Sequence, residues 1–300
     1  MALPVAKGST IKDTMGSRIF DVLNYLVIAV AAFICLAPFL FVISASVSPL
    51  NDVLSRKFFL YPKVIDLSTY KYLLSTPSLI RSIGISFLVT AVGTVISMFM
   101  TITLAYPLSK KELSGRGIVN AMIVFTMLFS GGMIPTYLVV SGLGLTDSLL
   151  SLWLPGAVSA YNMILLRNSF SGIPAELEEA ALIDGANYWT ILWKIIAPLS
   201  LASIATFALF YAVGYWNSYF DAVLYIDSAE RWPIQVWLRQ IVIMSSGGFS
   251  DNSSVSDMGY IPPQNISYAV IVFATVPILV VYPFIQKYFT KGVMMGSVKG

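Results

Sequence analysis

Hydrophobic residues in this chain gather into long stretches that are apolar on every side of a helix, separated by polar segments. A helix that spans a bilayer needs about 20 apolar residues, whereas a surface helix of a soluble protein is apolar along one face only. We therefore predict an all-α integral membrane protein with six transmembrane helices. The predicted spans are Val22–Ser46, Ser82–Leu108, Ile118–Leu143, Leu149–Leu166, Ile195–Tyr219 and Tyr268–Phe289.

Two of these spans contain residues that break regular helices. Gly131-Gly132 and Pro135 interrupt the third span, and Pro155-Gly156 interrupts the fourth. Membrane helices tolerate such residues where neighbouring helices satisfy the freed backbone groups, and broken helices also line the substrate pathways of transporters. Two interpretations stay open for each: a kinked helix, or a break beside a pathway.

The distribution of Lys and Arg predicts which ends of the helices face the cytoplasm. The short loop Leu108–Gly117 carries three basic residues, whereas the loop Gly144–Ser148 carries none. The loop after the first span is an exception, with five. Because cytoplasmic loops are enriched in Lys and Arg, we predict an N-in/C-in topology, with both termini in the cytoplasm.

This topology divides the chain into tails, spans and loops. In the first tail, Ile11, Met15 and Ile19 are spaced for one face of a short helix lying on the membrane, and a tail without fixed structure is the alternative for its first ten residues. The predicted parts are a cytoplasmic tail (1–21), a transmembrane domain (22–290), outside loops at about 47–81 and 220–267, a cytoplasmic loop at about 168–194, and a cytoplasmic tail (291–300).

Composition agrees with a chain that spans a lipid bilayer. Hydrophobic residues make up 57% of the 300 residues and charged residues only 11%, against about 25% charged in a soluble domain. Polar groups alone cannot cover the surface of such a chain, so lipid must cover part of it. The formal net charge of +3 is small and dispersed, which argues against a nucleic-acid partner.

Several kinds of chemistry are excluded by residues that the sequence lacks. Histidine is absent, which removes Ser-His-Asp catalysis and imidazole metal ligands. Cys35 is the only cysteine, so no intrachain disulfide can form. No Gly-Lys dipeptide occurs, so the chain has no phosphate-binding P-loop. We expect a non-catalytic membrane protein that binds no cofactor or metal itself.

The most informative segment is the cytoplasmic loop between the fourth and fifth spans, which predicts a helix, a break and a second helix. Pro174 fits the first turn of a helix, and three glutamates follow it near the positive end of the helix dipole. Gly185 provides the stop, because glycine readily adopts a left-handed conformation. Such an acidic helix suits docking into a groove on another protein, or is a connector lying on the membrane. Its face of mostly small side chains comprises Leu177, Ala180, Ala181 and Asp184.

This loop resembles a motif of a known family. Glu179-Ala180-Ala181, followed by Gly185, Ile195 and Pro198, resembles the EAA loop of the permease subunits of binding-protein-dependent ABC importers. Ala197 stands where the general motif has leucine, which is a mild departure. The surrounding sequence is similar to carbohydrate permeases of the maltose-transporter type, in their complex-polysaccharide branch. Four further stretches support this resemblance: Ala105–Lys110, Gly131–Tyr137, Leu154–Ala157 and Tyr215–Asp221.

The resemblance implies a type I ABC importer permease fold and a division of labour in a bacterial plasma membrane. It implies a second, related permease subunit, a dimer of ATP-binding subunits that hold ATP and Mg, and an extracytoplasmic solute-binding protein that delivers an oligo- or polysaccharide. Glu179 would pair with a basic residue of the ATP-binding subunit, and small residues beside it would allow close approach. The implied coupling residues are Glu179, Ala180, Ala181, Asp184, Gly185 and Pro198.

Aromatic and amide side chains of the fourth and fifth spans are candidates for sugar contact. Sugar rings stack on aromatic faces, and amides inside a membrane usually face a bundle or a cavity. The alternative is an interfacial aromatic belt, in which Tyr and Trp are enriched. The candidate residues are Tyr161, Asn162, Tyr211, Tyr215, Trp216 and Asn217.

Two other classes of membrane protein fit the sequence less well. A secondary transporter driven by an ion gradient usually needs acidic residues or histidine within its spans, whereas Asp21 and Asp221 lie at span edges here. A membrane-embedded enzyme is disfavoured by the absence of histidine and of clustered carboxylates in the spans. We therefore expect a permease subunit that depends on separate ATP-binding subunits.

Overall fold

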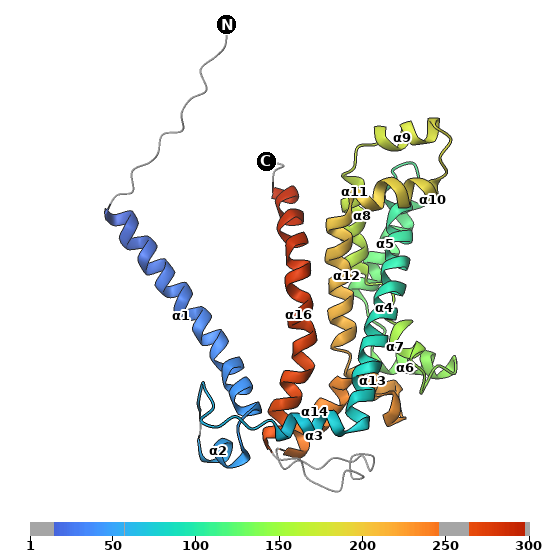
Figure 1. The fold of residues 1–300 in the computed structure, drawn as a ribbon. Helices are drawn as coiled ribbons and strands as arrows, with labels where there is room; N and C mark the ends of the chain where they lie inside the picture. Colours follow the sequence, from blue (N-terminus) through green and yellow to red (C-terminus); the bar gives the residue numbers. More distant parts are fainter. Residues whose placement is uncertain (1–14, 57, 246–263, 298–300) are drawn as a thin grey trace.

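The computed structural model describes residues 15–56, 58–245 and 264–297, and the regular elements in these segments are all helices (Figure 1). This confirms the predicted all-α class. The longer elements are α1 (Met15–Ser46), α4 (Pro77–Ser109), α5 (Arg116–Leu128), α6 (Met133–Gly142), α8 (Ala160–Ser171), α12 (Leu201–Trp216), α14 (Ile234–Ser245) and α16 (Gln264–Ser297). The shorter ones are α2 (Leu50–Ser55), α3 (Ser68–Ser75), α7 (Leu150–Trp153), α9 (Glu176–Ile183), α10 (Tyr188–Ile191), η1 (Leu192–Ile196), α11 (Ala197–Leu199), α13 (Phe220–Tyr225) and η2 (Ala229–Arg231).

The connecting elements lie at two opposite ends of the bundle (Figure 1). Helices α9 and α10 lie at what we call the upper end, as it is drawn, and α2, α3, α13 and α14 lie at the lower end. The loops predicted to face the cytoplasm, around 108–117 and 168–194, meet at the upper end through an ion pair between Lys110 and Glu178. The loops predicted to face outside meet at the lower end, where Asp147 contacts Ser228.

Helix α4 is the centre of the bundle and packs against α8 and α12. Small residues let neighbouring membrane helices approach closely, and hydroxyl groups can bond across the contact. Small buried residues of this kind recur along α4 at Ser82, Ser86, Gly93, Ser97 and Thr101.

Two tyrosines of α12 bond to this small-residue face of α4. The hydroxyl of Tyr215 lies 2.8 Å from that of Ser97, and the hydroxyl of Tyr211 lies 2.8 Å from that of Thr101. A Cβ atom added to Gly93 would lie 2.8 Å from the ring of Tyr215. The contact between α4 and α12 is thus so close that residue 93 has room for glycine and for little else.

Two predicted spans are broken rather than straight. The span expected over Ile118–Leu143 consists of α5 and α6, which meet at 114°. Gly132 lies at the break with φ +86°, a conformation that residues with a Cβ rarely adopt. The span expected over Leu149–Leu166 is a single turn, α7, followed by α8, because the Pro155-Gly156 pair interrupts the helix between them. Both segments are thus interrupted at the Gly and Pro residues that sequence analysis named.

A third bend lies in the fifth predicted span, where Tyr188–Leu199 and Leu201–Trp216 meet at 87°. Within the described residues, two helices are long and apolar enough to cross a membrane, and up to four spans result if each bent pair counts as one. The two long helices are α1 and α4. The six-span count and the N-in/C-in orientation stay predictions.

Helix α1 stands apart from the bundle over most of its length (Figure 1). It packs against α16 at its C-terminal end, where the rings of Phe41 and Tyr268 are 5.5 Å apart. Most of its apolar side chains are exposed in the single chain. Helix α1 spans Met15–Ser46, so residues 15–21 of the predicted tail 1–21 are helical, while Ile11 lies outside the described residues. Helix α16 similarly continues to Ser297, into the predicted tail 291–300.

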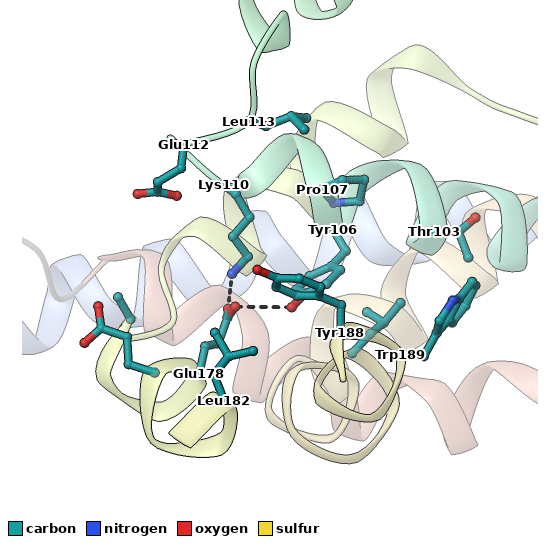
Figure 2. A pocket seen from close by; sticks show the side chains of 13 residues that line it. Thr103, Tyr106, Pro107, Lys110, Glu112, Leu113, Glu178, Leu182, Tyr188 and Trp189 are labelled. Carbon is teal, nitrogen blue, oxygen red and sulfur yellow. Dashed lines mark hydrogen bonds and ion pairs between the residues drawn. The ribbon is translucent and has the colours of Figure 1, made fainter. Parts of the chain in front are cut away.

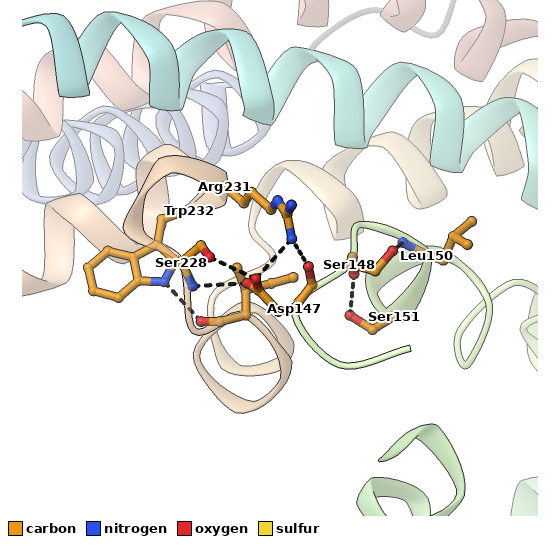
Figure 3. Close-up of polar contacts among 8 residues, drawn as sticks. Asp147, Ser148, Leu150, Ser151, Ser228, Arg231 and Trp232 are labelled. Carbon is orange, nitrogen blue, oxygen red and sulfur yellow. Dashed lines mark hydrogen bonds and ion pairs between the residues drawn. The ribbon is translucent and has the colours of Figure 1, made fainter. Parts of the chain in front are cut away.

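At the lower end, Asp147 joins the turn before α7 to the turn around η2 (Figure 3). It has φ +54°, and its carboxylate accepts hydrogen bonds from the backbone N–H and the hydroxyl of Ser228. The guanidinium of Arg231 lies 2.9 Å from the same carboxylate. The hydrogen bonds from Ser228 lower the pKa of the Asp147 carboxyl below its ordinary value, and the nearby charge of Arg231 lowers it further. Asp147 therefore fixes two lower-end loops to one another.

Candidate functional site

The loop that sequence analysis singled out forms a separate helix at the upper end, α9, as predicted (Figure 1). Its first turn holds three glutamates, which suits the positive end of the helix dipole. The helix begins after Ala175, so Pro174 lies just before it rather than in its first turn. The predicted acidic helix is thus present at the upper end of the bundle.

Gly185 ends α9 in the predicted left-handed conformation, with φ +81°. The backbone N–H of Gly185 donates to the carbonyl of Leu182, and that of Ala186 donates to the carbonyl of Ala181. This pair of bonds is a Schellman motif, which satisfies carbonyls that the end of a helix leaves free. No atom lies within 4 Å of the position of a Cβ on residue 185, so backbone conformation rather than space favours glycine here.

The second helix of the loop, formed by α10, η1 and α11, changes from α-helical to π-helical geometry before it reaches Pro198. It begins at α10, where the side chain of Asn187 accepts a hydrogen bond from the backbone of Thr190, and it passes through the π-helical segment η1 into α11. The N–H of Ala197 donates to Leu192, five residues back. Proline has no N–H and clashes with the preceding turn, so a wider register accommodates it. Pro198 lies in α11, two residues before the 87° bend that leads into α12.

One glutamate of α9 points into the protein (Figure 2). Glu178 is only 7% exposed, and its carboxylate forms an ion pair with Lys110. The other carboxylate oxygen accepts a hydrogen bond of 3.2 Å from the hydroxyl of Tyr106. The Lys110 ammonium also lies 4.8 Å from the centre of the Tyr106 ring, within range of a cation–π contact. Three polar groups from α9 and the end of α4 thus form one cluster.

A hollow of about 730 Å³ lies between α9, α10 and the end of α4 (Figure 2). Apolar side chains line most of it, and Glu112 and Glu179 add negative charge. The aromatic residues Tyr188 and Trp189 come from α10, and both are exposed in the single chain. The cavity leaves α9 joined to the bundle by a narrow contact.

The residues predicted for coupling divide between two faces of α9. Glu179, Ala180, Asp184 and Gly185 are exposed. Ala181 is only 9% exposed and packs in the core of the chain. Ala181 therefore faces the rest of the chain, because it lies three positions after Glu178 and so on the same side of the helix. The coupling roles themselves stay predictions.

The six residues predicted for sugar contact lie in different environments. Tyr211 and Tyr215 are buried and bonded to α4, and the indole N–H of Trp216 donates to the carbonyl of Ala274 at 3.0 Å. Their polar groups thus serve helix contacts within the chain.

The remaining three candidates lie on two helices. Asn217 follows α12 and is exposed, with its amide bonded to the carbonyl of Val213. On α8, Asn162 is 7% exposed whereas Tyr161 is 55% exposed. Contact of any of the six with sugar stays a prediction.

Sequence analysis missed two residues of the upper-end site, Tyr106 and Lys110. Both belong to the stretch Ala105–Lys110, which was noted there only for its family resemblance. They lie about 70 residues from Glu178 along the chain, and no local spacing connects them. Among the described residues, no group of three or more acidic, cysteine or histidine side chains is placed to hold a metal ion.

Comparisons with known proteins place this geometry in a family. No family model matches the chain. The permease protein YtcP of the polygalacturonan/rhamnogalacturonan transport system of Bacillus subtilis (strain 168) is 51% identical over 286 residues, which cover 95% of this chain and 100% of the relative. Protein LplC of the same organism is 47% identical over 297 residues, which cover 99% of this chain and 100% of the relative.

Solved structures agree with these relatives. A chain in the crystal structure of a bacterial ABC transporter involved in the import of the acidic polysaccharide alginate superposes with a TM-score of 0.84 and 34% identity, covering 92% of this chain and 98% of that one. A chain in the alginate transporter crystallised with its alginate pentasaccharide-bound periplasmic protein shares the fold alone, with a TM-score of 0.59 and 15% identity. The chain therefore belongs to the family of permease subunits of ABC carbohydrate importers.

Proposed function

We propose that this chain is one of two related permease subunits that together form the pathway of an ATP-driven importer of oligo- or polysaccharides. The importer lies in the plasma membrane of a bacterium, with the upper end of the chain in the cytoplasm. A dimer of ATP-binding subunits holds ATP and Mg and docks against that end. An extracytoplasmic solute-binding protein delivers the sugar at the lower end.

The observation that carries this proposal is the geometry of α9. It is an eight-residue helix at the upper end of the bundle, and it presents exposed Glu179 and Ala180 on its outer side. Its Schellman end at Gly185 keeps that surface small, because glycine has no side chain. A short acidic helix with small neighbours fits a groove on a partner that carries a basic residue. Closure of the ATP-binding subunits would then move α9 and, through it, the helices of the pathway.

The substrate class rests on the relatives. One transports polygalacturonan or rhamnogalacturonan, and the similar solved structure belongs to an importer of alginate, an acidic polysaccharide. We infer that this chain serves the uptake of polysaccharide fragments, with acidic fragments as the first to test. Tyr161, Asn162 and Asn217 are the sugar-contact candidates to retain, because helix contacts occupy the polar groups of Tyr211, Tyr215 and Trp216.

The exposed apolar surface of the single chain fits an assembly in a bilayer. Helix α1 has apolar side chains exposed along its length. In water such a surface would be costly, at about 25 cal/mol for each Å² of apolar area. Lipid tails and the second permease subunit would cover this surface in the membrane. The proposed subunit crosses the membrane several times, with both termini in the cytoplasm.

The proposal is tested by what purifies with this chain. An affinity tag on the chain, expressed in its native host, should retain a second permease and ATP-binding subunits, and this complex should hydrolyse ATP. The chain alone should hydrolyse none above background, because it has no P-loop. Substitution of Glu179 by Gln should lower the yield of the ATP-binding subunits, while Glu176→Gln serves as the matched control in the same turn. Hydrolysis by the isolated chain would overturn the division of labour.

A further inference from the structure

We propose that Glu178, Lys110 and Tyr106 form a latch that carries the movement of α9 to the central helix α4. This inference rests on the proposed function, since it concerns how a force applied to α9 reaches the membrane helices. We call the three residues the α4–α9 latch. Its members are positioning residues, because they touch neither ATP nor sugar in this account.

The latch lies in the narrow contact that joins α9 to the rest of the chain. Of the eight α9 residues, Glu178 and Ala181 are buried. They are three positions apart, so they lie on one face of the helix. Next to this face is the 730 Å³ hollow, which leaves α9 unsupported on that side. The ion pair and the hydrogen bond of Glu178 thus fix the orientation of α9 relative to the end of α4.

Burial makes this contact stiff. The side chain of Glu178 is 10% exposed and that of Lys110 is 29% exposed, so water competes weakly for the pair. A buried carboxylate that loses its partner has no replacement for the lost bonds, and such a loss is strongly destabilising. Separating α9 from α4 would create this unpaired charge. The cheaper response to a force on α9 is for the two helices to move together.

The other end of the latch is well placed to transmit such a movement. Tyr106 lies in the last turn of α4 and Lys110 caps its end. Helix α4 then runs without interruption over 33 residues to Pro77 at the lower end. There the backbone N–H of Ile234 donates to the hydroxyl of Ser86 at 2.8 Å. A displacement at the latch therefore reaches α12 along the bundle and α14 at the lower end.

Two adjacent glutamates of α9 make different contacts in this arrangement. Glu178 faces inward to α4, while Glu179 is exposed for a partner. Successive helical residues are rotated by about 100°, so one turn of α9 can hold both contacts. The latch also connects two stretches that carried the family resemblance, Ala105–Lys110 and the loop around Glu179. It gives the first stretch a mechanical role.

The test uses the complex purified through a tag on this chain, in proteoliposomes, and measures sugar uptake per ATP hydrolysed. The probes are labelled oligosaccharides of alginate and of polygalacturonan. Lys110→Glu and Glu178→Lys should each lower this ratio about fivefold or more, the smaller end of typical coupling between sites. The exchanged pair, with both substitutions in one chain, should recover most of the ratio. Lys111→Met and Glu176→Gln alter the charge of exposed neighbours outside the latch, and they should behave as the unmodified complex.

A chemical bridge tests the same idea without relying on charge. In a Cys35→Ala background, Lys110→Cys with Glu178→Cys removes the latch and should lower uptake per ATP. A short bifunctional thiol reagent that joins the two cysteines should restore it, because the joined helices again move together. This result would also separate the latch from a merely structural contact, since a structural contact would not respond to bridging after assembly.

Three outcomes overturn the latch. They are normal uptake per ATP in both single charge reversals, no recovery in the exchanged pair, and no recovery on bridging. If the single variants fail to assemble, the bridged pair decides. A failure of the proposed function is distinguishable, because the unmodified complex itself would then show no ATP-dependent uptake.

Discussion

Gly93 provides the sharpest prediction about packing in the bundle. A Cβ at this position would lie 2.8 Å from two atoms and 2.9 Å from a third atom of the Tyr215 ring. Carbon atoms in contact are about 3.5–4.0 Å apart, so Gly93→Ala creates an overlap of about 1 Å. Either α4 and α12 move apart or the ring moves, and ring movement strains the hydrogen bond to Ser97. The substitution therefore acts on the central helix contact.

The cost follows from these two terms. Overpacking costs about 1–3 kcal/mol, and loss of the hydrogen bond adds about 0.5–1.5 kcal/mol. Alanine also favours a helix over glycine by about 0.5–1 kcal/mol, which offsets part of the loss. Gly84, on the same helix, has no atom within 4 Å of its Cβ position, so Gly84→Ala has only the favourable term. The propensity gain is common to both substitutions, so we expect Gly93→Ala to be less stable than Gly84→Ala by about 1.5–4.5 kcal/mol.

The assay is unfolding of the tagged chain in detergent, followed by circular dichroism during titration with a denaturing detergent. Tyr215→Leu removes the ring, so it should reduce the effect of Gly93→Ala in a double-mutant cycle. Equal stability of Gly93→Ala and Gly84→Ala would refute the close contact between α4 and α12. So would a cycle in which the two substitutions are simply additive.

Three further predictions concern the two ends of the molecule. Gly185→Val should weaken co-purification of the ATP-binding subunits, since the left-handed conformation costs a residue with a Cβ about 1–2 kcal/mol, and unchanged co-purification would contradict this. The lowered pKa of Asp147 contributes stability that is present above its unfolded-state pKa and lost as pH falls through the folded-state pKa, so thermal stability should fall below about pH 4. Asp147→Asn should show a smaller fall, and an equal one would contradict the contact. In a Cys35→Ala background, Lys111→Cys should be labelled only from the cytoplasm and Lys63→Cys only from outside, and the reverse pattern would overturn the topology.

Some features of the fold followed from local sequence signals. Apolar stretches longer than 20 residues predicted α1 and α4, because a helix that is apolar all round over this length is typical of a membrane span. Gly185 predicted a left-handed helix end, because that conformation is a property of the residue itself. These signals depend on neighbouring residues, and the structure confirms them.

The features that sequence analysis missed depend on residues distant in the chain. Glu178 was grouped with two exposed glutamates, since nothing nearby in the sequence shows that Lys110 lies against it. Tyr211 and Tyr215 were grouped as a surface for sugar, whereas their hydroxyls meet Thr101 and Ser97 of α4. The size of the bend at Gly132 likewise depends on helix packing, so the breaking residues there predicted a break but not its angle. The bend before α12 was not predicted at all.

The central claim is that this chain forms part of an ATP-driven sugar pathway. The most direct measurement is uptake of labelled alginate or polygalacturonan oligosaccharides by proteoliposomes that hold the purified complex, with the solute-binding protein outside the membrane and ATP on the side of α9. The account predicts uptake that requires both ATP and the solute-binding protein. Uptake driven by an ion gradient without ATP, or no uptake of any oligosaccharide by a complex that hydrolyses ATP, would contradict it.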